Sequence, residues 1–135
     1  MKAKVPLIAR LLLGAVFLFG SVTFFLNLIP PPADMPERLT TFNAGLMASG
    51  YFFNLLKMTE LACGLMLVTG FFVPLALVVL APISLNIFLV HAILAPEGLP
   101  LAAIIGALMI YLSFFAEPYA SVIRPLFRPQ AATAT

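Results

Sequence analysis

Four long apolar stretches constrain this chain more than any other feature of its sequence. They cover about residues 7–29, 51–70, 72–95 and 100–116. The hydrocarbon core of a bilayer is about 30 Å thick and is crossed by a helix of about 20 apolar residues, with 17 near the lower limit. Inside lipid, every backbone polar group needs an internal partner, so such stretches fold as helices. The sequence predicts one membrane domain, an all-α integral membrane four-helix bundle.

Composition excludes the main alternatives. Charged residues make up 9% of the 135 residues, against about 25% in an ordinary soluble domain. The mean hydropathy is +1.15, and a soluble fold of this size cannot bury so much apolar surface. Disorder requires the opposite composition. A net charge of +2 is too small for nucleic-acid binding, so the expected partner is the lipid bilayer and no nucleic acid is expected.

The polar segment at residues 30–50 is predicted to be an outer loop that contains a helix. Leu39, Phe42 and Leu46 are spaced by three and four residues, which places them on one apolar stripe of a helix. We expect a short amphipathic helix on the membrane surface. An irregular loop is the alternative.

The basic residues predict the orientation. If both ends of the chain lie on one side of the membrane, that side holds Lys2, Lys4, Arg10, Arg124 and Arg128, and the other side holds only Arg38. Positively charged loops favour the cytoplasm. We therefore expect both termini, with the tail at 117–135, on the cytoplasmic side of a bacterial inner membrane, and an uncleaved first span.

Within the second and third stretches, the ionisable residues Lys57, Glu60 and His91 and the amide Asn86 are the most informative polar residues. An ionisable side chain at the centre of a bilayer costs about 2.5–3.5 kcal/mol, so each needs a reason. With about 1.5 Å of rise per residue, Lys57 and His91 lie about 9 and 6 Å from the outer end of their helices, and Glu60 and Asn86 about 13–14 Å. The levels match in pairs, which predicts a polar cluster that opens to the outer leaflet.

Structural roles for these residues stay open. Lys57 and Glu60 are three residues apart and could form an intrahelical ion pair that lowers the cost of insertion. His91 could extend to the membrane surface, and Asn86 could link two helices. Asn86 and His91 are five residues apart, about 140° around a helix, so they are not expected to share one face.

A second polar contact is predicted near the cytoplasmic edge. Arg10 begins a stripe that includes Gly14, and Gly106 begins a similar stripe that ends at Glu117. Small residues let membrane helices approach closely. The pattern predicts that the first and fourth stretches pack together and that Arg10 meets Glu117 in a structural contact.

The sequence offers few residues for catalysis or metal binding. It contains one histidine and one cysteine, Cys63, which cannot form a metal site or a dithiol pair. Motifs for zinc hydrolysis, phosphate binding or nucleophilic catalysis are missing from it. An autonomous enzyme is not expected, no cofactor is identified, and the oligomeric state stays open.

The chain resembles the DoxX family of small bacterial four-helix membrane proteins between residues 10 and 111. The most specific part contains Ala81-Pro82, Asn86, His91 and Ala95-Pro96. The other segments that carry the resemblance are RLLLG at 10–14, FG at 19–20, GYFF at 50–53, KMTE at 57–60 and GLML at 64–67. One departure is Ser21-Val22-Thr23, where many relatives have a basic residue.

The resemblance implies a protein that accompanies membrane-bound oxidoreductases and has no known cofactor of its own. It also places Lys57, Glu60, Asn86 and His91 at the polar positions of the family pattern. The first hypothesis is an accessory subunit with a redox protein partner and quinone as a candidate ligand. A ligand-free scaffold or assembly factor comes second, and a small transporter or proton path comes third.

Overall fold

The computed structural model describes residues 4–28 and 35–129 of the chain. The α-helices are α1 (Lys4–Leu26), α2 (Glu37–Ala48), α3 (Phe52–Thr69), α4 (Val73–Ile93), α5 (Leu99–Ile110) and α6 (Tyr119–Ile123). The shorter elements are the 3-10 helices η1 (Pro96–Gly98) and η3 (Arg124–Phe127) and the π-helical turn η2 (Tyr111–Phe115). Within the described residues there is no strand.

Four helical segments are long and apolar enough to cross a membrane: Lys4–Leu26, Phe52–Thr69, Val73–Leu94 and Pro96–Phe115. The prediction of an all-α integral membrane four-helix bundle is confirmed. α3 ends at Gly70, whose φ of +88° is a conformation that favours glycine. Pro82 lies inside α4 without ending that helix.

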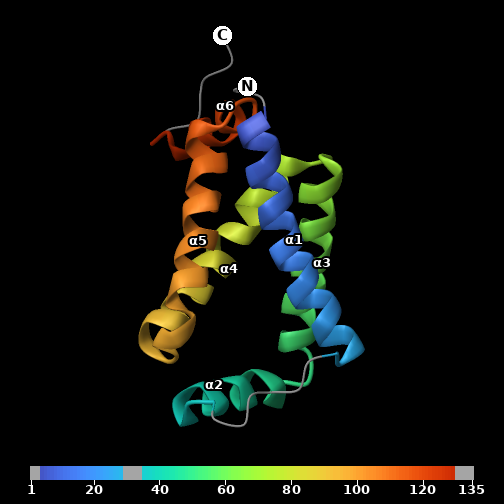
Figure 1. Ribbon diagram of the computed structural model, residues 1–135, viewed down its shortest axis with the longest axis vertical. Coiled ribbons are helices and arrows are strands. Elements are labelled where there is room, and N and C mark those ends of the chain that lie inside the picture. The colour runs from blue at the N-terminus through green and yellow to red at the C-terminus, as the bar shows by residue number, and fades with distance from the viewer. Residues whose placement is uncertain (1–3, 29–34, 130–135) are drawn as a thin grey trace.

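The helices form two pairs that diverge toward one end of the bundle (Figure 1). α1 packs along α3, and α4 packs along α5. The first turn of α1 and α6 lie at one end, whereas α2 lies across the other end (Figure 1). The fully buried leucines of the core come from the half near α6: Leu13, Leu67, Leu77, Leu80 and Leu112. The half near α2 is therefore left with less packing.

Glycine sets the close approach of α1 and α3. A Cβ at Gly14 would lie 2.8 Å from Val68 Cγ2 and 3.2 Å from the carbonyl oxygen of Gly64. A Cβ at Gly64 would lie 3.0 Å from Leu18 Cγ. Small residues at such crossings let backbones pack in lipid. The predicted approach of small residues therefore occurs between α1 and α3, not between α1 and α5.

We expect Gly14→Leu to destabilise the folded protein by about 2 kcal/mol, because the added side chain overfills a packed crossing. Unfolding in mixed detergent micelles, followed by circular dichroism, measures this loss. Gly20→Leu is the matched control, since no atom outside the local helix backbone lies within 4 Å of its added Cβ. Equal loss in both variants would contradict the packing argument.

The segments outside the four spans differ partly from expectation. The predicted amphipathic helix is present as α2 (Glu37–Ala48). The region after residue 116 was expected to be a tail, but it forms α6 and η3 as far as Phe127. The end of the predicted first span and the start of the outer loop, at residues 29–34, lie outside the described residues, as do Lys2 and residues 130–135.

Candidate functional site

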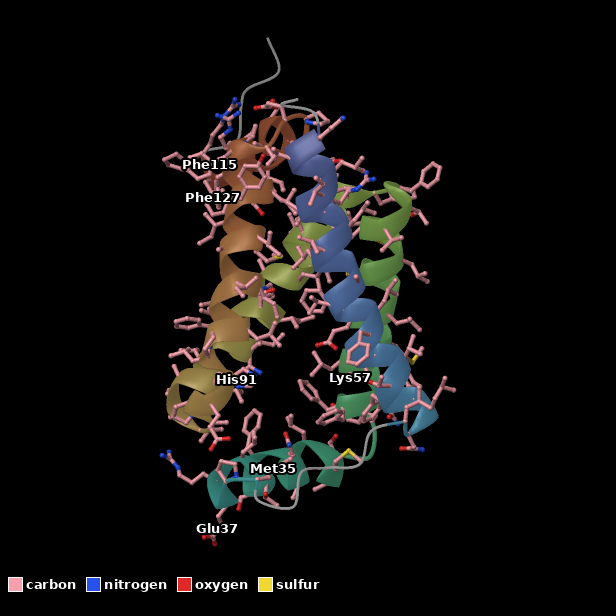
Figure 2. The ribbon with its side chains drawn as sticks, in the orientation of Figure 1. Met35, Glu37, Lys57, His91, Phe115 and Phe127 are labelled. Carbon is pink, nitrogen blue, oxygen red and sulfur yellow. The ribbon has the colours of Figure 1, made fainter. Side chains whose placement is uncertain are left out.

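A cavity of about 300 Å³ lies between α3 and α4 and is bounded at one end by α2. We call it the outer cavity. Its lining residues are Leu39, Phe42, Asn43, Leu46, Phe53, Leu56, Lys57, Glu60, Asn86, Ile87, Val90 and His91. All four side chains of the predicted polar cluster therefore line one cavity. Figure 2 shows Lys57 and His91 at one level, on opposite sides of the space above α2.

The α3 wall carries an ion pair. Lys57 Nζ lies 3.2 Å from Glu60 Oε2, and the two side chains are 21% and 6% exposed. The ammonium also lies 5.9 Å from the ring centroid of Phe24 and 5.8 Å from that of Phe53. Carboxylate and aromatic faces both stabilise a cation in apolar surroundings. The Lys57 ammonium is therefore fixed in position on this wall, and its N–H groups that do not bond Glu60 can donate hydrogen bonds.

The α4 wall carries the amide and the imidazole. Asn86 and His91 both line the outer cavity, with Ile87 and Val90 between them around the helix. Asn86 and His91 were not expected to share one face, yet both line the outer cavity, which extends around α4 from one to the other. Asn86 is exposed and His91 is half-buried, so the cavity is open near Asn86.

The third wall comes from α2 and was missed. Leu39, Phe42 and Leu46 form the predicted apolar stripe, but the stripe lines the outer cavity beside Asn43. These residues are half-buried. The spacing of three and four residues predicts that these side chains share one face of the helix. It does not tell whether that face packs against lipid or against the rest of the protein. Only the position of α2 across the open end of the bundle shows which it faces (Figure 1).

The predicted contact between Arg10 and Glu117 does not form. Arg10 Nη1 donates a hydrogen bond to Tyr119 Oη over 3.2 Å. Glu117 instead pairs with Arg124 at 2.5 Å and accepts a hydrogen bond from Ser121. The reason is that the backbone becomes extended at Ala116, with ψ of 118°, so Glu117 leaves the helical register that its stripe assumed.

The small-residue stripe of α5 faces a second hollow. A groove of about 540 Å³ lies between α4 and the run of α5 and η2. Gly106 lines it, and no atom outside the local backbone comes within 4 Å of a Cβ built there. Its walls are apolar side chains apart from Ser84 and Ser113. α1 does contact α5 and η2, as predicted, but Gly106 faces this groove and does not set a close approach to α1.

Four apolar helices around an intramembrane polar cavity define the chain as a small multi-pass membrane protein. Residues 5–95 match the DoxX family, and the chain belongs to this family. The matched residues include all four members of the polar cluster and stop before η1. Comparisons with curated proteins and with solved structures found no match.

Proposed function

We propose that the chain is an accessory subunit of a membrane-associated oxidoreductase system and that its outer cavity binds the head group of a quinone. The observation that supports this most strongly is the convergence of Lys57, Glu60, Asn86 and His91 on one cavity with apolar walls. Intramembrane ionisable residues are costly and commonly mark functional sites. Ligand sites likewise combine apolar walls with a few converging polar groups.

The polar groups suit the chemistry of a quinone. Its two carbonyl oxygens accept hydrogen bonds, and the Lys57 ammonium and the Asn86 amide can donate them. A cavity of about 300 Å³ lies at the small end of ligand pockets, which fits one ring with its apolar tail left in lipid. The opening near Asn86 supplies a route for that tail.

A redox partner is part of this proposal. The chain has a single cysteine, Cys63, which is buried in α3, so it cannot cycle between a dithiol and a disulfide. Electrons would therefore enter or leave the bound quinone through another protein. We propose that the protein lies in a bacterial inner membrane with both termini in the cytoplasm. The basic residues Lys4, Arg10 and Arg124 lie at the end of the bundle that holds α6 (Figure 1), and positive charge favours the cytoplasmic side. The outer cavity then faces the opposite leaflet.

Photolabelling tests the proposed site. A short-chain quinone with a photoreactive group should label peptides from α2, α3 and α4 of the protein in lipid nanodiscs. Asn86→Ala should reduce labelling about tenfold, because the hydrogen bond from the amide to a quinone carbonyl is lost. Asn54→Ala is the matched control, since Asn54 is an exposed residue of α3 that does not line the cavity. Labelling that is absent, or equal in both variants, would contradict quinone binding here and favour the scaffold.

A further inference from the structure

His91 is held by the connection that follows its helix. Its Nδ1 lies 3.3 Å from the carbonyl oxygen of Ala95. A carbonyl oxygen only accepts hydrogen bonds, so Nδ1 must carry the proton of this contact. In a neutral imidazole the other nitrogen is then an acceptor. In the neutral ring, the Ala95 contact therefore favours the form in which Nε2 carries no proton and can accept a hydrogen bond from a ligand.

Gly98 gives the ring room for this position. A Cβ at residue 98 would lie 2.3 Å from His91 Nδ1 and 2.4 Å from His91 Cε1. The backbone of Gly98 has a φ of −91°, which any residue can adopt. Backbone conformation therefore does not require glycine at this position. The space taken by the imidazole requires it.

The two walls of the outer cavity thus differ in hydrogen-bonding character. Lys57 offers only N–H donors on the α3 side, whereas His91 offers an acceptor on the α4 side. A quinone has a carbonyl acceptor at each end of its ring. A carbonyl oxygen that faces His91 Nε2 would place two acceptors opposite each other, with no proton to form a hydrogen bond. A hydroquinone has hydroxyl groups, which both donate and accept, and it satisfies both walls.

We infer that the outer cavity prefers the reduced, hydroquinone form of its ligand, and that Gly98 is the positioning residue that keeps His91 Nε2 available as the acceptor. This inference rests on the proposed quinone function. It adds to the proposed function which redox form of the ligand the cavity holds. A hydroquinone is the product of a reaction that reduces quinone, or the substrate of a reaction that oxidises hydroquinone. Asn86 can serve either form, since its amide donates and accepts.

The tautomer of His91 can be measured directly. His91 is the single histidine of the chain, so nitrogen NMR of the histidine-labelled protein in nanodiscs reports one ring. We expect the Nδ1–H form in the unmodified protein and a loss of that form in Gly98→Ala, because the new Cβ displaces the ring from Ala95. The Nε2–H form in the unmodified protein would overturn the inference.

Binding measurements test the preference itself. Calorimetry under anaerobic conditions, with one short-chain quinone and its hydroquinone, should give about tenfold tighter binding of the hydroquinone, because the quinone leaves a buried acceptor unpaired. Gly98→Ala should bring the ratio of the two dissociation constants close to one. Gly106→Ala should keep the ratio, since the added Cβ there meets open space.

The outcomes separate the two proposals. Equal binding of both forms, or tighter binding of the quinone, would overturn the hydroquinone preference and leave the quinone site standing. Binding of neither form would overturn both. A ratio that Gly98→Ala leaves unchanged would remove Gly98 as a positioning residue, because a merely structural role affects both affinities alike.

Discussion

Lys57→Met is expected to destabilise the folded protein by about 3 kcal/mol, since it leaves the buried Glu60 carboxylate without its cation. Glu60 is 4% exposed, and its side chain lies 3.2 Å from the lysine ammonium. Unfolding in mixed detergent micelles, followed by circular dichroism, gives the change in free energy. Lys4→Met at the exposed start of α1 should change it by less than about 0.5 kcal/mol.

Removing both charges should reverse most of this loss. The Lys57→Met/Glu60→Met variant has no buried charge, and replacing a buried ion pair with apolar side chains is often close to neutral. The same variant should lose quinone photolabelling if the pair binds the ligand. Retained labelling in this variant would instead favour an ion pair that only lowers the cost of insertion. A double variant as unstable as Lys57→Met would contradict the pairing argument.

Much of the fold follows from the sequence because lipid allows few solutions. Uninterrupted apolar stretches must be helical, and proline and glycine mark where they begin and end. The polar cluster was also predictable to a useful degree. Helix rise gave the depths of Lys57, Glu60, Asn86 and His91 along their two helices. The structure places all four side chains around the outer cavity.

The rotation of each helix about its axis was not predictable. In lipid, apolar residues cover every side of a spanning helix, so hydrophobicity does not distinguish the buried face from the exposed face. Gly14 packs against α3, whereas Gly106 lines the groove beside α4. Both are small residues in similar stripes. Contacts that depend on such rotations, including that of Arg10 with Tyr119, need the three-dimensional packing.

The position of α2 relative to the four spans was also not predictable from the sequence. This position affects how a ligand or water reaches the outer cavity. The helix contacts α3, and its side chains at 39, 42 and 46 line the outer cavity. It is followed by Gly50, whose φ is +82°. A helix held mainly by one apolar stripe can separate from the bundle at low cost in free energy. α2 would then control the entry of water into the cavity from its own end of the bundle.

Replacing Leu39, Phe42 and Leu46 together with serine is expected to open the outer cavity. Each half-buried side chain contributes about 1 kcal/mol to the packing of α2 against the bundle. The fraction of molecules in which α2 has separated from the bundle should therefore rise about a hundredfold. The measurement is the labelling rate of a cysteine at Val90, a cavity residue, in a Cys63→Ser background. A charged maleimide that does not cross membranes reports access from water.

The opposite face of α2 supplies the control. Serine at Thr40, Ala44 and Met47, all exposed, should leave the labelling rate unchanged, because these side chains do not line the cavity. Intact cells give the orientation in the same experiment: reagent added outside should label the opened variant if the termini are cytoplasmic. Fast labelling only from inverted vesicles would reverse the orientation. Equal rates with and without the apolar stripe would show that α2 does not restrict entry, so that ligand and water reach Lys57 and His91 by the opening near Asn86.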